Sequence, residues 1–499
     1  MRAISIAVLL LSIWQVQARM ALKDIIERYE SRYGLIFDAP RTLSERYGYV
    51  TQSKSETDVP TRILQLGIDI NVHSCSSAPL KAKVNSPLSV AMVLGELLLG
   101  ANGKTSKELV DAFGIDGNGE FHNEFGKLVD EFSRTYQLRG LRRRHIQVSP
   151  NTHKISIANG IFLQTGINLR PNYQSTVRRI YRSEISNLDF RQASGMQARD
   201  YINNWVERKT QGKIHQIIGE EIPEDKKMII VNALYFHSFW KTPFIKGATT
   251  RGNFYPDGIH SKSISDIPMM IVTGVFPYYE STDYGCRIIG LPYKGNDAVM
   301  YIILPNDSSR KSLQAFQTEV NADVIQGWIQ RTELRSVMVS LPKMHFQSAV
   351  NLKEALKAKG VHSLFDSKEC DLSSMVATDT TGSIPQDNKD DYIYLINPRV
   401  DAIESKRTRF PPNRLMHNLR TFGRSSEQLK DNVFVENILH KVDLNINEAG
   451  AEGAAVTATT LSRVDVEEDL EVNSPFLFLV QHTKTKLALF YGAVFDPTS

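Results

Sequence analysis

The stretch Asn447–Leu461 reads NEAGAEGAAVTATTL, and its composition decides how the rest of the chain is interpreted. It is rich in small residues and contains no proline. If residues 451–458 form a β-strand, alternate side chains point to opposite faces. One face then carries the only charge of the strand, Glu452, and the other carries only small uncharged side chains: Ala451, Gly453, Ala455 and Thr457. Composition alone leaves two interpretations open, a flexible Gly/Ala linker or a strand able to enter the middle of a sheet.

The 499-residue chain has the composition of an ordinary globular protein, with 41% hydrophobic and 23% charged residues. Its formal net charge of +4 gives no general reason to expect a nucleic-acid partner. Helical patterns cover 64–100, 120–138 and 197–211, and Thr105 with Glu108 indicates a capping box for another helix. Strand patterns concentrate later, and the apolar run 228–237 is typical of a strand buried on both faces. The order predicts an α+β fold.

The N-terminus predicts the compartment. Residues 1–18 carry one basic residue, a short apolar run and small residues before a cleavage position, as a secretory signal peptide does. We therefore expect a secreted, extracellular protein with no membrane-spanning segment and one glycosylation sequon, at Asn306. Residues 19–60 are expected to form an N-terminal extension. Residues 61–499 are expected to form a single domain, interrupted by a polar insertion at about 376–430.

Patterns that would indicate an enzyme are missing from the sequence. Gly103-Lys104-Thr105 resembles the end of a phosphate-binding loop, but Leu98 stands where that loop needs glycine. Neither G-x-S-x-G nor H-E-x-x-H occurs. Three scattered cysteines are too few for a disulfide framework or a zinc site. We expect no catalytic activity, no metal and no cofactor.

Short stretches spread along the chain resemble one family, the serpins (serine protease inhibitors). The similarity covers about residues 64–375 and 431–496. In chain order the stretches are NSPLSV at 85–90, LGANGKT at 99–105, ANGIFL at 158–163, INNWV at 202–206, TQGKI at 210–214, VNALYF at 231–236 with Trp240, LPY at 291–293, LPK at 341–343, HK at 440–441, NEAG at 447–450 and SPFLF at 474–478. Each is weak alone, but their common order is specific.

The resemblance implies three β-sheets, eight or nine helices and an exposed reactive-centre loop. It also implies a suicide mechanism. A target protease attacks the loop and forms an acyl-enzyme, and the cut loop then inserts into the large sheet as a new strand, a known form of strand addition. Seven residues fall in the loop hinge of the family: Glu448, Gly450, Ala451, Glu452, Gly453, Ala454 and Ala455. Ala449 and Ala451 depart from the usual polar residue and threonine.

The resemblance also implies a position for the reactive bond, through two spacings that are typical of inhibitory serpins. Sixteen residues after Glu448 and eleven before Pro475 both lead to Val464, so cleavage of Val464–Asp465 is expected. This implies an elastase-like protease. Cleavage of Arg463–Val464 is the alternative and implies a trypsin-like protease, because its pocket pairs with an arginine. The acidic stretch 465–471 either selects proteases with a basic surface or keeps the loop solvated.

Five residues match family positions that control the opening of the large sheet: Ser86, Ser89, Asn232, His440 and Trp240. A basic segment matches the helix region that binds glycosaminoglycans in some serpins, and its arginines are Arg139, Arg142, Arg143 and Arg144. This segment is either such a site or a solvated loop.

Two further functions stay open beside a monomeric, secreted inhibitor of a protease cascade. One is a non-inhibitory serpin that acts as a carrier, storage protein or matrix ligand. The other is a glycosaminoglycan-binding structural protein with a vestigial loop.

Overall fold

The computed structural model describes residues 58–74, 81–142, 154–377, 433–450 and 466–498, and all structural statements below concern these residues. The helices are α3 (Val59–His73), α4 (Pro87–Gly100), α5 (Gly103–Phe113), α6 (Asn118–Arg142), α7 (Pro171–Ile180), α8 (Met196–Lys209), α9 (Arg310–Glu319), α10 (Ala322–Arg331) and α11 (Lys353–Ala358). The strands are β1 (Ala82–Asn85), β2 (Lys154–Gln164), β3 (Glu184–Leu188), β4 (Met228–His237), β5 (Thr250–Phe254), β6 (Ile264–Ser281), β7 (Cys286–Pro292), β8 (Ala298–Pro305), β9 (Glu333–Pro342), β10 (Met344–Asn351), β11 (Ile438–Ile446), β12 (Glu468–Glu471), β13 (Phe476–His482) and β14 (Ala488–Val494).

One sheet has five strands in the order β10-β11-β4-β2-β3. The central strand β4 runs parallel to its neighbour β11, and Ile438–Asp443 pairs with Ile230–Tyr235. We call this pairing the seam. On its other side β4 pairs antiparallel with β2. The sequence separates β11 from β4 by two hundred residues, so a parallel pair in the centre of the sheet requires a long connection.

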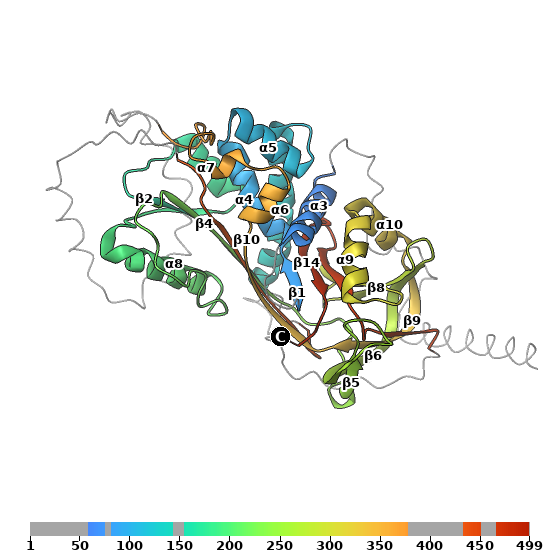
Figure 1. Cartoon of the computed structure of the whole chain (residues 1–499). Helices are drawn as coiled ribbons and strands as arrows, with labels where there is room; N and C mark the ends of the chain where they lie inside the picture. The colour runs from blue at the N-terminus through green and yellow to red at the C-terminus, as the bar shows by residue number, and fades with distance from the viewer. Residues whose placement is uncertain (1–57, 75–80, 143–153, 378–432, 451–465, 499) are drawn as a thin grey trace, which may run out of the picture. The chain divides into compact units, whose positions relative to one another are not determined.

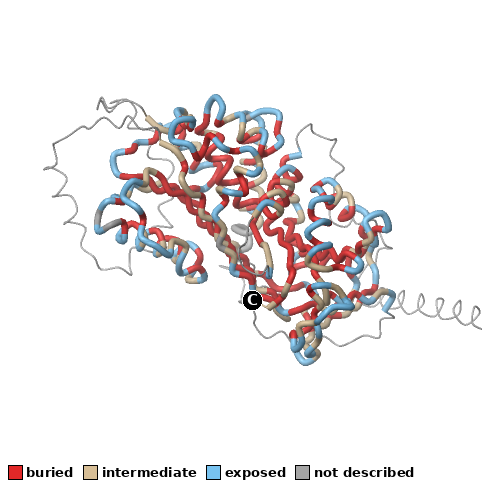
Figure 2. Tube along the Cα trace, in the orientation of Figure 1, coloured by how far each residue is buried: buried red, intermediate tan, exposed pale blue. Residues whose placement is uncertain are grey.

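Helices cover this sheet on both faces (Figure 1). Ile230 and Leu234 of β4 point into the large core that also contains much of α4. The alternate residues Val231 and Ala233 point into a second cluster with Trp205 of α8. Figure 2 shows the resulting continuous buried path along the strands. The predicted strand at 228–237, buried on both faces, is therefore confirmed.

The second sheet follows the order β1-β14-β13-β8-β7-β6-β9-β12, with β5 also paired to β6. The family resemblance implies three sheets, and here the two smaller ones join into one hydrogen-bonded path through β6. This strand is 18 residues long, pairs with β9 over Met269–Tyr278, and pairs with β7 over Tyr278–Ser281. Because β6 is so long, it pairs with β7 at one end and with β9 along the rest, and so connects the two sheets that the resemblance treats as separate.

Several expected elements have different limits in the structure. The helical pattern of 64–100 is divided by β1 into α3 and α4, whereas the helices at 120–138 and 197–211 correspond to α6 and α8. The capping box of Thr105 and Glu108 is absent, because α5 begins at Gly103 after Asn102. In the described part of the chain, no helix combines the length and the apolar character that crossing a bilayer requires.

Candidate functional site

The chain reverses direction immediately after β11. Asn447 and Gly450 exchange two backbone hydrogen bonds, of 3.0 and 3.2 Å, and the Asn447 side chain accepts a third from the Ala449 N–H. Gly450 also forms an antiparallel bridge with Phe239, just beyond the end of β4. At Gly450 the backbone therefore runs antiparallel both to the segment that follows β4 and to the segment that follows β11. The reversal places Gly450, the second of the predicted hinge residues, between the extensions of β11 and β4.

Gly450 occupies a position that other residues fit poorly. Its φ is +139°, and a Cβ there would lie 2.1 Å from the Ser238 carbonyl oxygen. That distance is far inside van der Waals contact, and such a φ is essentially restricted to glycine. Local sterics therefore explain why the predicted hinge has glycine at position 450.

We call the end of the seam nearest Gly450 its upper end, and the opposite end its lower end. Trp240 and Glu448 hold the upper end. Trp240 donates from its backbone N–H to the Ala449 carbonyl at 3.0 Å and from Nε1 to the Asn447 carbonyl at 2.9 Å. Its ring stacks on Tyr293 with centroids 4.5 Å apart. The Glu448 carboxylate accepts hydrogen bonds from Lys343 Nζ at 3.0 Å and Thr249 Oγ1 at 3.1 Å. The start of the hinge is fixed by both backbone and side chain.

The contacts of Glu448 favour its charged form. Partial burial alone would raise the pKa of this carboxyl, but its own backbone N–H, Lys343 and Thr249 together hold the pKa below its usual value. The ion pair with Lys343 is therefore present at neutral pH.

His440 holds the middle of the seam. Its Nε2 accepts a hydrogen bond from the Ser86 backbone N–H at 3.0 Å, so Nδ1 carries the proton and donates to Asn232 Oδ1 at 3.2 Å. Burial lowers the pKa of His440 to about 4, so the ring is neutral. Ser86 caps α4 by accepting from the Ser89 N–H at 3.3 Å. Asn232 Nδ2 and Ser89 Oγ are buried without a partner among the described residues.

The lower end of the seam is closed by an ion pair between Lys226, which precedes β4, and Glu436, which precedes β11. On the α8 side, Lys441 donates to the Gln216 carbonyl at 2.6 Å. Neither Lys226 nor Glu436 was identified from the sequence, because they lie 210 residues apart. Lys343 could have been found, since it ends the family-like LPK stretch.

The structure thus brings together Ser86, Ser89, Asn232 and His440, with Trp240, Glu448 and Gly450 at one end of the same seam. Other predicted positions lie outside the described residues: Ala451, Glu452, Gly453, Ala454, Ala455, Arg463, Val464, Asp465, Arg143 and Arg144. Arg139 and Arg142 belong to the end of α6, so glycosaminoglycan binding stays a prediction. Asn306 is exposed and follows β8.

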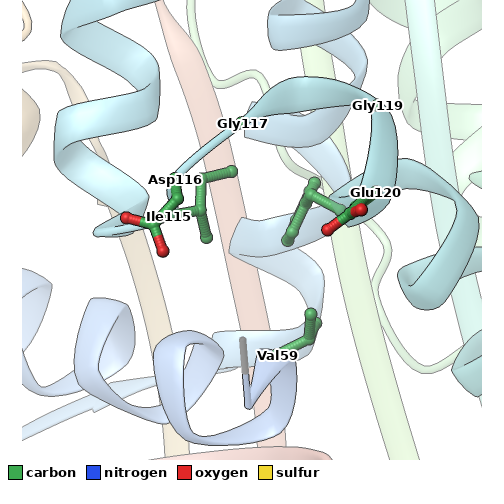
Figure 3. Close-up of a pocket in the computed structure, with 7 residues that line it drawn as sticks. Val59, Ile115, Asp116, Gly117, Gly119 and Glu120 are labelled. Carbon is green, nitrogen blue, oxygen red and sulfur yellow. The ribbon is translucent and has the colours of Figure 1, made fainter. Parts of the chain in front are cut away.

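Other features of the described residues lie away from the seam. A small cavity of about 310 Å³ lies beside the connection of α5 and α6, lined by Val59, Ile115, Asp116, Gly117, Gly119, Glu120 and Phe121 (Figure 3). Cys286 and Cys370 are buried free thiols. Within the ranges given above, no group of three His, Cys, Asp or Glu side chains is placed to hold a metal ion.

Comparisons with known proteins agree with this geometry. The family model described as Serpin (serine protease inhibitor) matches residues 62–497. Serine protease inhibitor 28Dc of Drosophila melanogaster is 33% identical over 475 residues, covering 92% of this chain and 83% of that protein. Leukocyte elastase inhibitor A of Mus musculus is 27% identical over 419 residues, covering 83% and 92%.

Among solved structures, serpin-12 of Manduca sexta superposes with a TM-score of 0.66 at 19% identity, covering 88% of this chain and 99% of the other. Serpin48 of Tenebrio molitor gives a TM-score of 0.65 at 21% identity, covering 89% and 100%. The chain belongs to the serpin (serine protease inhibitor) family and has the α+β serpin fold.

Proposed function

We propose that this chain is a secreted inhibitor that traps a serine protease as an acyl-enzyme and then inserts its cleaved loop into the seam between β11 and β4. The observation that carries the proposal is Gly450, which is already antiparallel to the extensions of both strands. A strand continued from this residue enters the seam in the correct direction. The named inhibitors among the relatives support the same function.

The pairing of Gly450 also sets the register of the proposed strand. Each later residue of the loop meets the preceding residue of β4 and of β11, since both pairings are antiparallel. Thr457 then falls opposite Asn232 and His440, which are themselves paired across the seam. Ala451, Gly453 and the other small residues of that set face the core containing α4. Glu452 faces away from this core, as the alternation in the sequence requires.

Insertion is favourable because of the hydrogen bonds it creates. One parallel pairing is replaced by two antiparallel pairings, which are slightly more stable per residue. Each additional backbone hydrogen bond contributes about 0.5–1.5 kcal/mol net. The partnerless Asn232 Nδ2 lies opposite the hydroxyl of Thr457 in this register. The form with the loop outside the sheet is therefore proposed to be metastable.

The chemistry begins with attack of the protease serine on the Val464 carbonyl carbon. The C–N bond to Asp465 breaks, the new amine takes a proton, and Val464 stays esterified to the protease. Insertion to Leu461 reaches the beginning of β4 and carries Val464 about 45 Å from Gly450, at about 3.3 Å per residue. The attached protease moves with it to the other end of the sheet.

Secretion is part of the proposal. It is supported by the signal-like residues 1–18 and by the exposure of Asn306 on the connection after β8. Expression of the full chain in a eukaryotic secretory cell should give protein in the medium that begins at Arg19. An Asn306→Gln variant should lack the mass of one glycan. Protein that stays inside the cell with an intact N-terminus would contradict secretion.

Inhibition is tested by mixing the protein with an elastase-like and a trypsin-like protease, followed by denaturing gels. A complex that survives SDS, together with a C-terminal fragment beginning at Asp465, is the expected result with the elastase-like enzyme. Val464→Asp should abolish this complex, and Arg463→Gln should leave it intact. The opposite pattern, with a fragment beginning at Val464, assigns specificity to Arg463. Cleavage without any complex would contradict inhibition and favour a non-inhibitory serpin.

A further inference from the structure

Helix α4 contacts both sides of the seam. At its beginning, the Ser86 backbone N–H is bonded to His440 of β11. Ten residues later, Glu96 accepts hydrogen bonds from Asn159 of β2 and from Ser183, which directly precedes β3. The two attachment points lie about 15 Å apart along the helix, at 1.5 Å per residue. The same helix thus attaches to β11 on one side of the seam and to β2 and β3 on the other.

The polar side chains form one row beneath the sheet. Asn159 pairs with Asn232 across β2 and β4, and Asn232 pairs with His440 across the seam. All three point toward α4, and Glu96 and Ser86 contact the two ends of the row. Opening the seam for a new strand separates its sides by about 4.8 Å. One attachment to α4 must then stretch or break.

The hydrogen bonds of Glu96 are asymmetric. Oε1 accepts both of them, whereas Oε2 is buried without a partner among the described residues, and the residue has 0% exposure. An ionised carboxylate would leave a charged oxygen without solvent or donors, which is costly. A neutral acid fits, with Oε1 as the carbonyl and Oε2 as the hydroxyl. Burial raises the pKa of Glu96 to about 8, against the opposing hydrogen bonds from Ser183 and Asn159.

The groups facing Glu96 from neighbouring elements are neutral. They are Tyr173 and Tyr181 of the α7 region, whose pKa values burial raises. Behind Tyr181 lies His122 of α6, which is hydrogen-bonded to the Tyr181 hydroxyl and whose pKa burial lowers to about 4. Tyr173 donates to the Glu96 backbone carbonyl at 3.0 Å. Glu184, beside Ser183, instead accepts from Trp205 and pairs with Lys209. α4 contains no ionisable side chain other than that of Glu96.

We propose that Glu96 is a positioning residue whose proton controls loop insertion: in its neutral form it attaches β2 and β3 to α4 and holds the seam closed. The inference rests on the proposed insertion mechanism. When the proton is lost, hydration lowers the free energy of the charged carboxylate. Water can reach it only if α4 and β2 separate. Sheet opening therefore becomes easier as pH rises.

The sign follows from proton binding. An opened state that hydrates Glu96 has an ordinary carboxyl pKa, so it binds fewer protons than the closed state between about pH 4.5 and pH 8. The closed state loses its advantage as pH rises through this window, and the change stops above it. Glutamine keeps one acceptor and one donor but cannot ionise, so Glu96→Gln should remove this dependence.

The test is uptake of a synthetic peptide of residues 451–464 by the intact full-length protein, followed by its conversion to a heat-resistant form. Rates are measured from pH 6 to pH 9 for the wild type, Glu96→Gln and the control Glu354→Gln, whose exposed carboxyl pairs with Lys357. The ratio of the wild-type rate to the Glu96→Gln rate should rise by up to about fiftyfold between pH 6 and pH 8 and by less than about twofold from pH 8 to pH 9. Glu354→Gln should follow the wild type.

A second variant keeps the proposal testable if Glu96→Gln does not fold. Ser183→Ala removes a hydrogen bond that lowers the pKa of Glu96, so the midpoint of the rate increase should move to higher pH. A rate ratio constant within about twofold, or a Ser183→Ala profile identical to the wild type, would overturn the role of Glu96 while leaving insertion intact. Failure of every protein to take up the peptide would overturn insertion itself, and with it the role of Glu96.

Discussion

Strand β4 has two different neighbours. On one side it pairs antiparallel with β2 over ten residues, from Met228 to His237. On the other side it pairs parallel with β11 over six, from Ile230 to Tyr235. The shorter pairing is reinforced by local contacts at its ends and middle, through Glu448, His440 and the Lys226–Glu436 ion pair.

The difference supports the seam, and not the pairing of β4 with β2, as the place of the proposed insertion. Antiparallel pairing with β2 is longer and more stable per residue, so β2 and β4 are expected to move together. The seam depends on a few polar contacts that a new strand can replace. The predictions below test this comparison, starting with the largest expected effect.

Ala451→Arg should convert the inhibitor into a substrate. In the proposed register this side chain faces the core of α4, and burying an unpaired charge costs several kcal/mol. The fraction of protease trapped as an SDS-stable complex should fall by more than about tenfold. Glu452→Arg is the matched control, because the neighbouring side chain faces away, and its complex should persist. Equal trapping by both variants would rule out the register.

His440 should make the seam sensitive to acid. Its pKa of about 4 in the folded chain lies below the unfolded value of about 6.5, so the unfolded chain binds more protons between these values. The free energy of unfolding should fall by up to about 3 kcal/mol from pH 6.5 to pH 4 because of this residue. His440→Gln should remove this contribution from the profile measured by denaturant unfolding and leave those of His122 and His482. His260→Gln, at an exposed position, should not change it.

Gly450→Ala should destabilise the upper end of the seam without affecting β2. The added Cβ meets the Ser238 carbonyl, and the positive φ is strained for alanine. We expect a loss of about 2 kcal/mol and a lower thermal midpoint. Gly117→Ala is the control, since nothing lies within 4 Å of its Cβ. Equal midpoints for the two variants would show that Gly450 is not constrained.

Glu448→Gln should have the smallest effect, at most about 1 kcal/mol, because Lys343 is half exposed and solvent screens the pair. The pKa of Glu448 is lowered in the folded chain, so its contribution is present above the unfolded pKa and is lost as pH falls through the folded pKa. Wild type and variant should therefore converge in acid. A difference in the thermal midpoint that does not shrink as the pH falls would argue against the ion pair.

Local sequence predicted the features that depend on local chemistry. The apolar run of β4 indicated burial on both faces, which the structure confirms. The strand indicated by the small residues after Gly450 lies outside the described residues and stays a prediction. Long-range partners were not predictable in this way. Thr105 and Glu108 look like a capping box, but Thr105 accepts from the Asp371 N–H and Glu108 from the His362 and Ser363 N–H groups.

β6 was missed for a related reason. Pro268, Gly274 and Pro277 indicate breaks, yet all lie in one 18-residue strand paired with β9. Tertiary pairing with both β7 and β9 outweighs the local preference of these residues. The same holds for Glu96, whose isolated charge in an apolar helix gave no sign of its partners Asn159 and Ser183.

The most direct test compares the intact protein with protein cut once in the loop at Val464–Asp465. If the cut segment becomes a strand between β11 and β4, the thermal midpoint should rise by at least about 10 °C, and a crystal of the cut form should show Thr457 between Asn232 and His440. An unchanged midpoint, with His440 still bonded directly to Asn232 in that crystal, would contradict the account.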